Sequence, residues 1–84
     1  MKYIVMCDND GAEIIILFPK TIHHDAMADS VSSMRDQTHG PWRRIFRTPV
    51  SAGFVSKNKV CHGRSETLAL ESRPEDTALL IGQF

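Results

Sequence analysis

Signatures of disulfide-rich, membrane and secreted proteins are absent from this sequence. Two cysteines, Cys7 and Cys61, are too few and too far apart for a disulfide framework. The longest apolar run, residues 14–18, is far shorter than the ~20 residues that a membrane helix needs. The N-terminal stretch MKYIVMCDND lacks the long apolar core and the cleavage site of a signal peptide. We therefore expect a cytoplasmic protein with reduced thiols and no membrane association.

Motifs for catalysis and for metal binding are also missing. The stretch GRSE at 63–66 is not a G-x-S-x-G nucleophile elbow, and no phosphate-binding G-x-x-x-x-G-K-[ST] pattern occurs. DNDG at 8–11 resembles the start of a calcium loop but lacks its third ligand and its final glutamate. No C-x-x-C or H-x-x-x-H spacing joins the candidate metal ligands, which are His23, His24, His39, Cys61 and His62. The sequence predicts no enzyme, no catalytic residue, no cofactor and no structural metal.

Acidic residues are absent from one long stretch of a chain that has no net charge. The 29-residue window from Gln37 to Ser65 has six basic residues and no acidic one, a local charge of +6. The remainder carries four basic and all ten acidic residues, a charge of −6. Such an uneven distribution can mark the surface that binds a partner.

The length and the composition indicate one soluble globular domain over residues 1–84. A chain of 84 residues buries roughly 60–65% of its unfolded surface, so its core is small. The chain is 42% hydrophobic and 24% charged, which is typical of a folded domain rather than of a disordered chain.

Residues 2–18 predict a β-hairpin, because two apolar runs flank the turn pair Asp10-Gly11. A two-residue loop would place Cys7 opposite Ile14 and Val5 opposite Ile16. Both faces of this hairpin are apolar, so we expect it to lie centrally in a sheet that is covered on both sides. Two short helices would cover only one face, and the other face would pair with a second copy in a homodimer.

The rest of the chain predicts two helices and several short strands. Met27, Val31 and Met34 recur at helical spacing after a cap at Thr21 or His23. Strands are expected at roughly 43–48, 50–56, 60–62 and 66–71, with a bend or bulge at Pro49 and Gly53. The stretch SRPEDTALLIGQF begins with a helix start, in which Ser72 is the cap, Pro74 lies in the first turn and Glu75 completes a capping box. The predicted fold is α+β, with an antiparallel sheet of four to six strands and two short helices in the order ββαβββ(β)α.

The stretch WRRIFR at 42–47 is the centre of the basic window. As a strand it would place Arg43, Ile45 and Arg47 on one face and Trp42, Arg44 and Phe46 on the other. We predict that eight residues form a partner-binding face: Trp42, Arg43, Arg44, Phe46, Arg47, Lys57, Lys59 and Arg64.

Three interpretations of this basic window remain open. The arginines are solvated charges that protect edge strands from aggregation, or they bind an acidic protein surface. Alternatively, they bind nucleic acid or a nucleotide, with Trp42 or Phe46 stacking on a base. Nonspecific binding to duplex DNA is disfavoured, because the chain is neutral overall and its acidic flanks would repel a long phosphate backbone.

The stretches PVSAGFV at 49–55 and SRPEDTALL at 72–80 resemble small proteins encoded by phages and prophages of proteobacteria. A further stretch, ILFP…IHHDAMAD, occupies a comparable position in them. Small phage accessory proteins often bind a host protein or nucleic acid, and anti-defence proteins such as anti-CRISPR proteins are among them. The resemblance implies the context of a phage accessory protein in a bacterial host cytoplasm. Together with the basic window, it leads us to expect a protein that binds a host protein with an acidic surface. The alternative is a binding module for nucleic acid or for a small anionic ligand such as a nucleotide.

Overall fold

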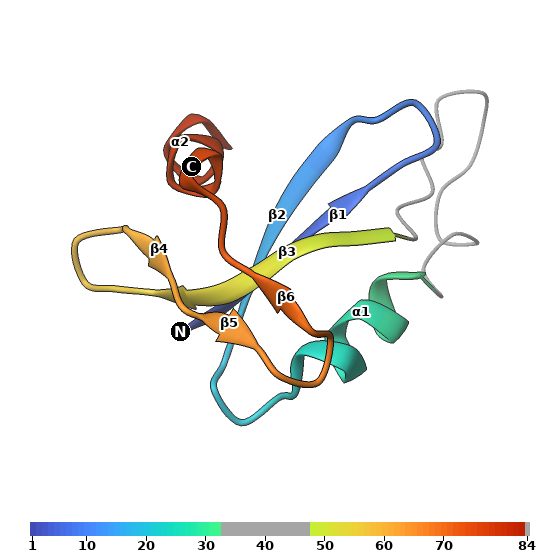
Figure 1. Ribbon diagram of the computed structural model, residues 1–84, viewed down its shortest axis with the longest axis horizontal. Coiled ribbons are helices and arrows are strands. Elements are labelled where there is room, and N and C mark those ends of the chain that lie inside the picture. The colour runs from blue at the N-terminus through green and yellow to red at the C-terminus, as the bar shows by residue number, and fades with distance from the viewer. Residues whose placement is uncertain (33–47, 84) are drawn as a thin grey trace.

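The computed structural model describes residues 1–32 and 48–83 and has the predicted α+β architecture (Figure 1). A four-stranded antiparallel sheet has the order β2-β1-β3-β4, and a second sheet pairs β5 with β6. The elements follow the chain order β1 Lys2–Cys7, β2 Glu13–Phe18, α1 His24–Ser32, β3 Thr48–Val55, β4 Cys61–His62, β5 Arg64–Ser65, β6 Leu70–Glu71 and α2 Pro74–Gln83. The predicted strand at 43–48 lies outside the described residues except for Thr48, which begins β3, and Met34 also lies outside them.

The N-terminal hairpin is present, but its register differs by one residue from the prediction. The Asp8 N–H donates to the Ala12 carbonyl at 2.9 Å, so the loop contains three residues, 9–11, rather than two. Gly11 has the positive φ of 85° that ends such a loop, and the Asp8 carboxylate accepts hydrogen bonds from the N–H groups of Asp10 and Ala12. Cys7 therefore lies opposite Glu13, and Val5 lies opposite Ile15. A shift of one residue exchanges the faces on which the β2 side chains lie.

Strand β1 forms the centre of the core, since Tyr3, Ile4, Val5 and Met6 are all fully buried. It lies between β2, which is an edge strand, and β3. One face packs Tyr3 and Val5 against Leu80 of α2, and the other packs Ile4 and Met6 against Ala28 of α1. Figure 1 shows the two helices on opposite sides of the sheet. The prediction that both hairpin faces are apolar is confirmed, but the prediction that the helices leave one face open is wrong.

Strand β3 bends where the sequence predicted an irregularity. Its pairing with β1 shifts between Val5 and Met6, which lie opposite Ser51 and Pro49, so β3 has one extra residue at this point. Gly53 allows β3 and β4 to approach closely, because a Cβ there would lie 2.4 Å from the carbonyl oxygen of His62.

Two local predictions in the second half need correction. Residues 66–69 form a turn rather than a strand, in which Ala69 has a φ of 55° and the Ser65 hydroxyl accepts the Leu68 N–H at 3.3 Å. Helix α2 begins one residue later than expected. Arg73 rather than Ser72 is the cap, and Asp76 rather than Glu75 closes the capping box by accepting the Arg73 N–H at 2.9 Å.

Candidate protein-binding surface

The predicted binding face is only partly within the described residues. Five of its eight members lie outside them: Trp42, Arg43, Arg44, Phe46 and Arg47. The other three, Lys57, Lys59 and Arg64, are all exposed. The positions of these three residues show which parts of the surface lie beside the basic window.

Lys57 and Lys59 lie together in the turn that joins β3 to β4. The Lys59 N–H donates to the Ser56 carbonyl at 3.0 Å, and the Ser56 N–H donates to Val60 at 3.0 Å, so two backbone hydrogen bonds close the turn. Lys59 borders a groove beside α2, whereas Arg64, on β5, borders a different pocket near the start of α1. The described part of the basic window therefore divides between two sites.

The groove beside α2 has a volume of about 420 Å³ and an apolar lining. Leu17 and Val55 form its floor on the sheet, Leu80 and Ile81 form its wall on α2, and Lys59 is the one charged residue among the lining residues that the structure describes. Two large apolar side chains in its neighbourhood are exposed, Ile81 by 64% and Val60 by 46%. An apolar hollow with exposed aliphatic side chains is typical of a surface that binds another protein.

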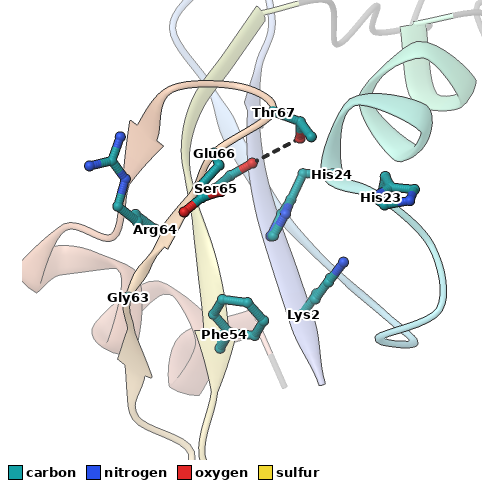
Figure 2. Close-up of a pocket in the computed structure, with 9 residues that line it drawn as sticks. All are labelled: Lys2, His23, His24, Phe54, Gly63, Arg64, Ser65, Glu66 and Thr67. Atoms are coloured by element: carbon teal, nitrogen blue, oxygen red, sulfur yellow. Dashed lines mark hydrogen bonds between the residues drawn. The ribbon is translucent and has the colours of Figure 1, made fainter.

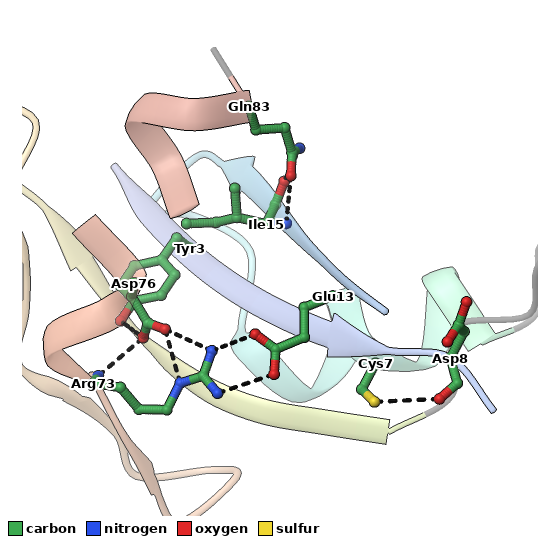
Figure 3. Close-up of polar contacts among 8 residues, drawn as sticks. All are labelled: Tyr3, Cys7, Asp8, Glu13, Ile15, Arg73, Asp76 and Gln83. Atoms are coloured by element: carbon green, nitrogen blue, oxygen red, sulfur yellow. Dashed lines mark hydrogen bonds and ion pairs between the residues drawn. The ribbon is translucent and has the colours of Figure 1, made fainter. Parts of the chain in front are cut away.

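A polar network centred on the buried side chains of Tyr3 and Asp76 fixes the position of α2, and therefore of the groove wall (Figure 3). The Tyr3 hydroxyl donates to Asp76 Oδ2 at 2.6 Å, and Arg73 Nε donates to Asp76 Oδ1 at 2.8 Å. The Arg73 guanidinium also makes a two-point contact with Glu13, at 2.8 and 3.1 Å. These bonds connect the start of α2 to both strands of the N-terminal hairpin.

The network holds two carboxylates and one guanidinium, and its most buried carboxylate, Asp76, stays ionised. Burial alone would raise the pKa of Asp76, which is completely inaccessible, but hydrogen bonds from Tyr3 and Arg73 outweigh burial and hold that pKa below its ordinary value. Burial and the neighbouring Asp76 carboxylate raise the pKa of Tyr3 well above its ordinary value. Hydrogen bonds from Arg73 lower the pKa of Glu13. Asp76 is thus an ionised structural anchor, not an acid poised to exchange a proton near neutral pH.

The far end of α2 is attached to the sheet by a second polar contact. Gln83 Nε2 donates to the Ile15 carbonyl at 2.8 Å, and Gln83 Oε1 accepts the Ile15 N–H at 3.0 Å (Figure 3). The side-chain amide thereby replaces the neighbouring strand that the β2 edge lacks at this residue. Contacts at both ends hold α2 in place, so the groove is a preformed feature of the fold.

The described residues include a buried thiol and several candidate metal ligands. Burial raises the pKa of the Cys61 thiol, which disfavours the thiolate that a nucleophile needs. Among residues 1–32 and 48–83, no three histidine, cysteine or acidic side chains gather closely enough to hold a metal ion. Neither helix in these ranges has the length and apolar composition needed to cross a lipid bilayer.

The apolar residues of the groove were not among the predicted site residues. The sequence did contain a signal for Ile81. Leu79 and Leu80 suffice to pack α2 against the core, so Ile81, the third consecutive apolar residue, is not needed on the packed face. Leu17 and Val55 could not be identified in this way. The apolar pattern of each strand predicts that these side chains are buried, and it does not indicate which of them a helix leaves uncovered.

Comparisons with protein families, curated proteins and solved structures found no match to this chain.

Proposed function

We propose that this protein is a non-catalytic binding protein that acts by occupying the surface of another protein. The observation that carries the proposal is the groove beside α2, where four apolar side chains adjoin the exposed lysine of the β3–β4 turn. Aliphatic side chains of the partner would fill the groove, and burial of that apolar surface would supply most of the affinity.

Charge specifies the kind of partner. Lys57 and Lys59 lie in one turn, of which Lys59 borders the groove, and no acidic residue occurs anywhere between Thr48 and Ser65. A partner with carboxylates beside its apolar residues would gain favourable contacts with these lysines, mainly through faster association at low salt. The partner in this proposal is accordingly a protein with an acidic surface.

The phage resemblance supplies the biological setting of the proposal. In that setting the protein is an accessory protein in the cytoplasm of a bacterial host, and its partner is a host protein, with a defence component as the first candidate. The predicted homodimer stays a prediction. Its original basis, a sheet face without a helix, no longer applies, and among the described residues the groove is an apolar surface that would be available to a second copy.

Two substitutions test the groove without disturbing the core. Ile81→Asp places a charge on an exposed side chain of the groove wall, and Lys59→Glu reverses the charge at its border. Immobilised variants are compared with the wild type for the proteins that they retain from a bacterial lysate, after each variant is shown to melt normally. We expect Ile81→Asp to retain the wild-type partner at least tenfold less well, since the cost of a buried unpaired charge exceeds 1.4 kcal/mol. Lys59→Glu should instead slow association with the partner, most strongly at low salt.

Matched controls separate a local effect from a change of net charge. Ala26→Asp adds the same charge on α1, which lies on the opposite face of the sheet, and Lys20→Glu reverses an exposed lysine in the loop after β2. If all four variants retain the partner equally well, the proposal that the groove is the binding site is contradicted. If the Lys59→Glu variant retains the same proteins as the wild type but fewer oligonucleotides, nucleic acid is favoured as the ligand.

A further inference from the structure

A second hollow lies on the other face of the sheet, at the N-terminal end of α1 (Figure 2). It has a volume of about 560 Å³, within the usual range for sites of small ligands. Its walls come from the start of β1, the end of β3, the start of α1 and the β5–β6 turn. This pocket shares no lining residue with the groove beside α2.

An aromatic ring forms one wall of the pocket. Phe54 contacts the buried His24 ring edge to face at 5.8 Å and stacks with His62 at 6.2 Å, which holds the ring in a fixed orientation. His24 is itself fixed by a 3.0 Å hydrogen bond between its Nε2 and the Gly53 carbonyl and by an edge contact to Phe18. A flat ligand ring can stack on such a rigid aromatic wall at little entropic cost.

A cation lies close to this aromatic wall. The half-buried Lys2 ammonium donates one hydrogen bond to the Ile22 carbonyl at 3.0 Å and makes no ion pair with a described residue. An ammonium has three N–H donors, so two remain for a ligand. Figure 2 shows Lys2 and His24 facing the same space beside the start of α1. An anionic group placed there would meet the Lys2 ammonium.

Hydroxyl and carboxylate groups occupy another side of the pocket. Ser65 and Thr67 are joined by a 3.2 Å contact between their hydroxyl oxygens, and Glu66 lies between them in the sequence. A carboxylate accepts hydrogen bonds from hydroxyl or amino groups, and it repels a ligand of high negative charge. The pocket thus combines a stacking wall, a place for one anionic group and an acceptor for neutral donors.

We infer that this pocket binds a nucleoside monophosphate, with the base stacked on Phe54 and the phosphate at Lys2. A nucleoside monophosphate has the three required features: a flat ring, one phosphate, and sugar hydroxyl groups that can donate to Glu66. The inference goes beyond protein binding and does not depend on it, because the pocket and the groove lie on opposite faces of the sheet.

Isothermal titration of the whole protein with adenosine monophosphate tests the inference. Adenosine alone and inorganic phosphate alone are the two other arms, and they separate the contributions of the ring and of the anion. We expect the monophosphate to bind at least tenfold more tightly than either part. Lys2→Gln should weaken its binding about tenfold, as expected for loss of a charge-assisted hydrogen bond, and should leave adenosine unaffected.

Lys57→Gln is the matched control, since it removes one positive charge from the distant β3–β4 turn. Equal weakening by both substitutions, or no binding at millimolar monophosphate, would overturn the inference. A spectrum of amide chemical shifts on the wild-type protein makes the test independent of variant folding. The inference requires the ligand to shift the resonances of Phe54, Ser65 and His24, and shifts confined to Leu17, Leu80 and Ile81 would refute it.

Discussion

Gly53 lies at the point where β3 is closest to both of its neighbours. A Cβ at this position would lie 2.4 Å from the His62 carbonyl oxygen and 3.2 Å from the Tyr3 ring. Both obstacles are poorly movable, because one is backbone and the other is a fully buried side chain. Glycine here is a packing requirement, although the sequence alone predicted only a bend or a bulge.

We expect Gly53→Ala to lower the free energy of unfolding by about 2 kcal/mol, as overpacking in a close-packed core usually does. Gly82→Ala is the control, since a Cβ at this helical position meets no atom within 4 Å. That control should stabilise the protein by roughly 0.5–1 kcal/mol, because alanine favours the helix. Urea unfolding measures both values, and equal effects would contradict the close approach.

Asp76 and Glu13 make the free energy of unfolding depend on pH in the acidic range. Their pKa values in the folded protein lie below the ordinary values of 3.8 and 4.5, so the unfolded chain binds more protons than the folded protein in this range. The stabilisation is therefore complete above these ordinary values and is lost as the pH falls below them. We expect the contribution of these two carboxylates to the free energy of unfolding to be constant from about pH 7 to pH 5 and to decrease below pH 4.5.

Tyr3→Phe shows how much of this acid dependence belongs to Asp76. The variant removes the 2.6 Å hydrogen bond to a completely buried carboxylate, so it should cost about 2 kcal/mol at pH 7. It should also raise the pKa of Asp76, and the decrease of stability in acid should become shallower. Parallel curves of stability against pH for the two proteins would show that Asp76 does not contribute.

At the scale of elements, α2 has two roles: it packs on the core, and it forms hydrogen bonds with the edge strand β2 where a neighbouring strand would otherwise do so. The two bonds between Gln83 and Ile15 satisfy backbone groups on the edge of β2. We expect Gln83→Ala to speed the hydrogen exchange of the Ile15 amide and to lower the free energy of unfolding by about 0.5–1 kcal/mol. Gln83→Glu retains the acceptor and loses the donor, so its Ile15 amide should exchange at an intermediate rate. Unchanged exchange in both variants would contradict the contact.

The types of most elements could be predicted from the sequence, but their local geometry depended on single side chains. The apolar runs around DNDG suffice to predict a hairpin, whereas its register depends on the Asp8 carboxylate, which stabilises a three-residue loop. The alternation at 66–71 resembles a strand, but the Ser65 hydroxyl closes a turn there. The cap of α2 shifted by one residue, because Asp76 has Tyr3 as a distant partner that no local pattern reveals.

For the whole molecule, the sequence predicted an α+β domain with a doubly apolar hairpin, and that architecture is confirmed. The assignment of helices to faces could not be predicted, because apolar periodicity shows that a helix has a docking face but not which surface it meets. Of the predicted site residues, Lys59 borders the groove and Arg64 borders the pocket. The groove and the pocket combine residues from β1, β2, β3, α1 and α2, which only the tertiary fold brings together.

The contacts between the first and the last parts of the chain have a consequence for biosynthesis. Tyr3 meets Asp76 across 73 residues, and Ile15 meets Gln83 across 68 residues. While the chain is being translated, the N-terminal hairpin leaves the ribosome long before these partners and exposes one apolar face without α2. The nascent chain therefore cannot complete this core until residues 76–83 emerge, and until then it exposes apolar surface of the kind that chaperones bind.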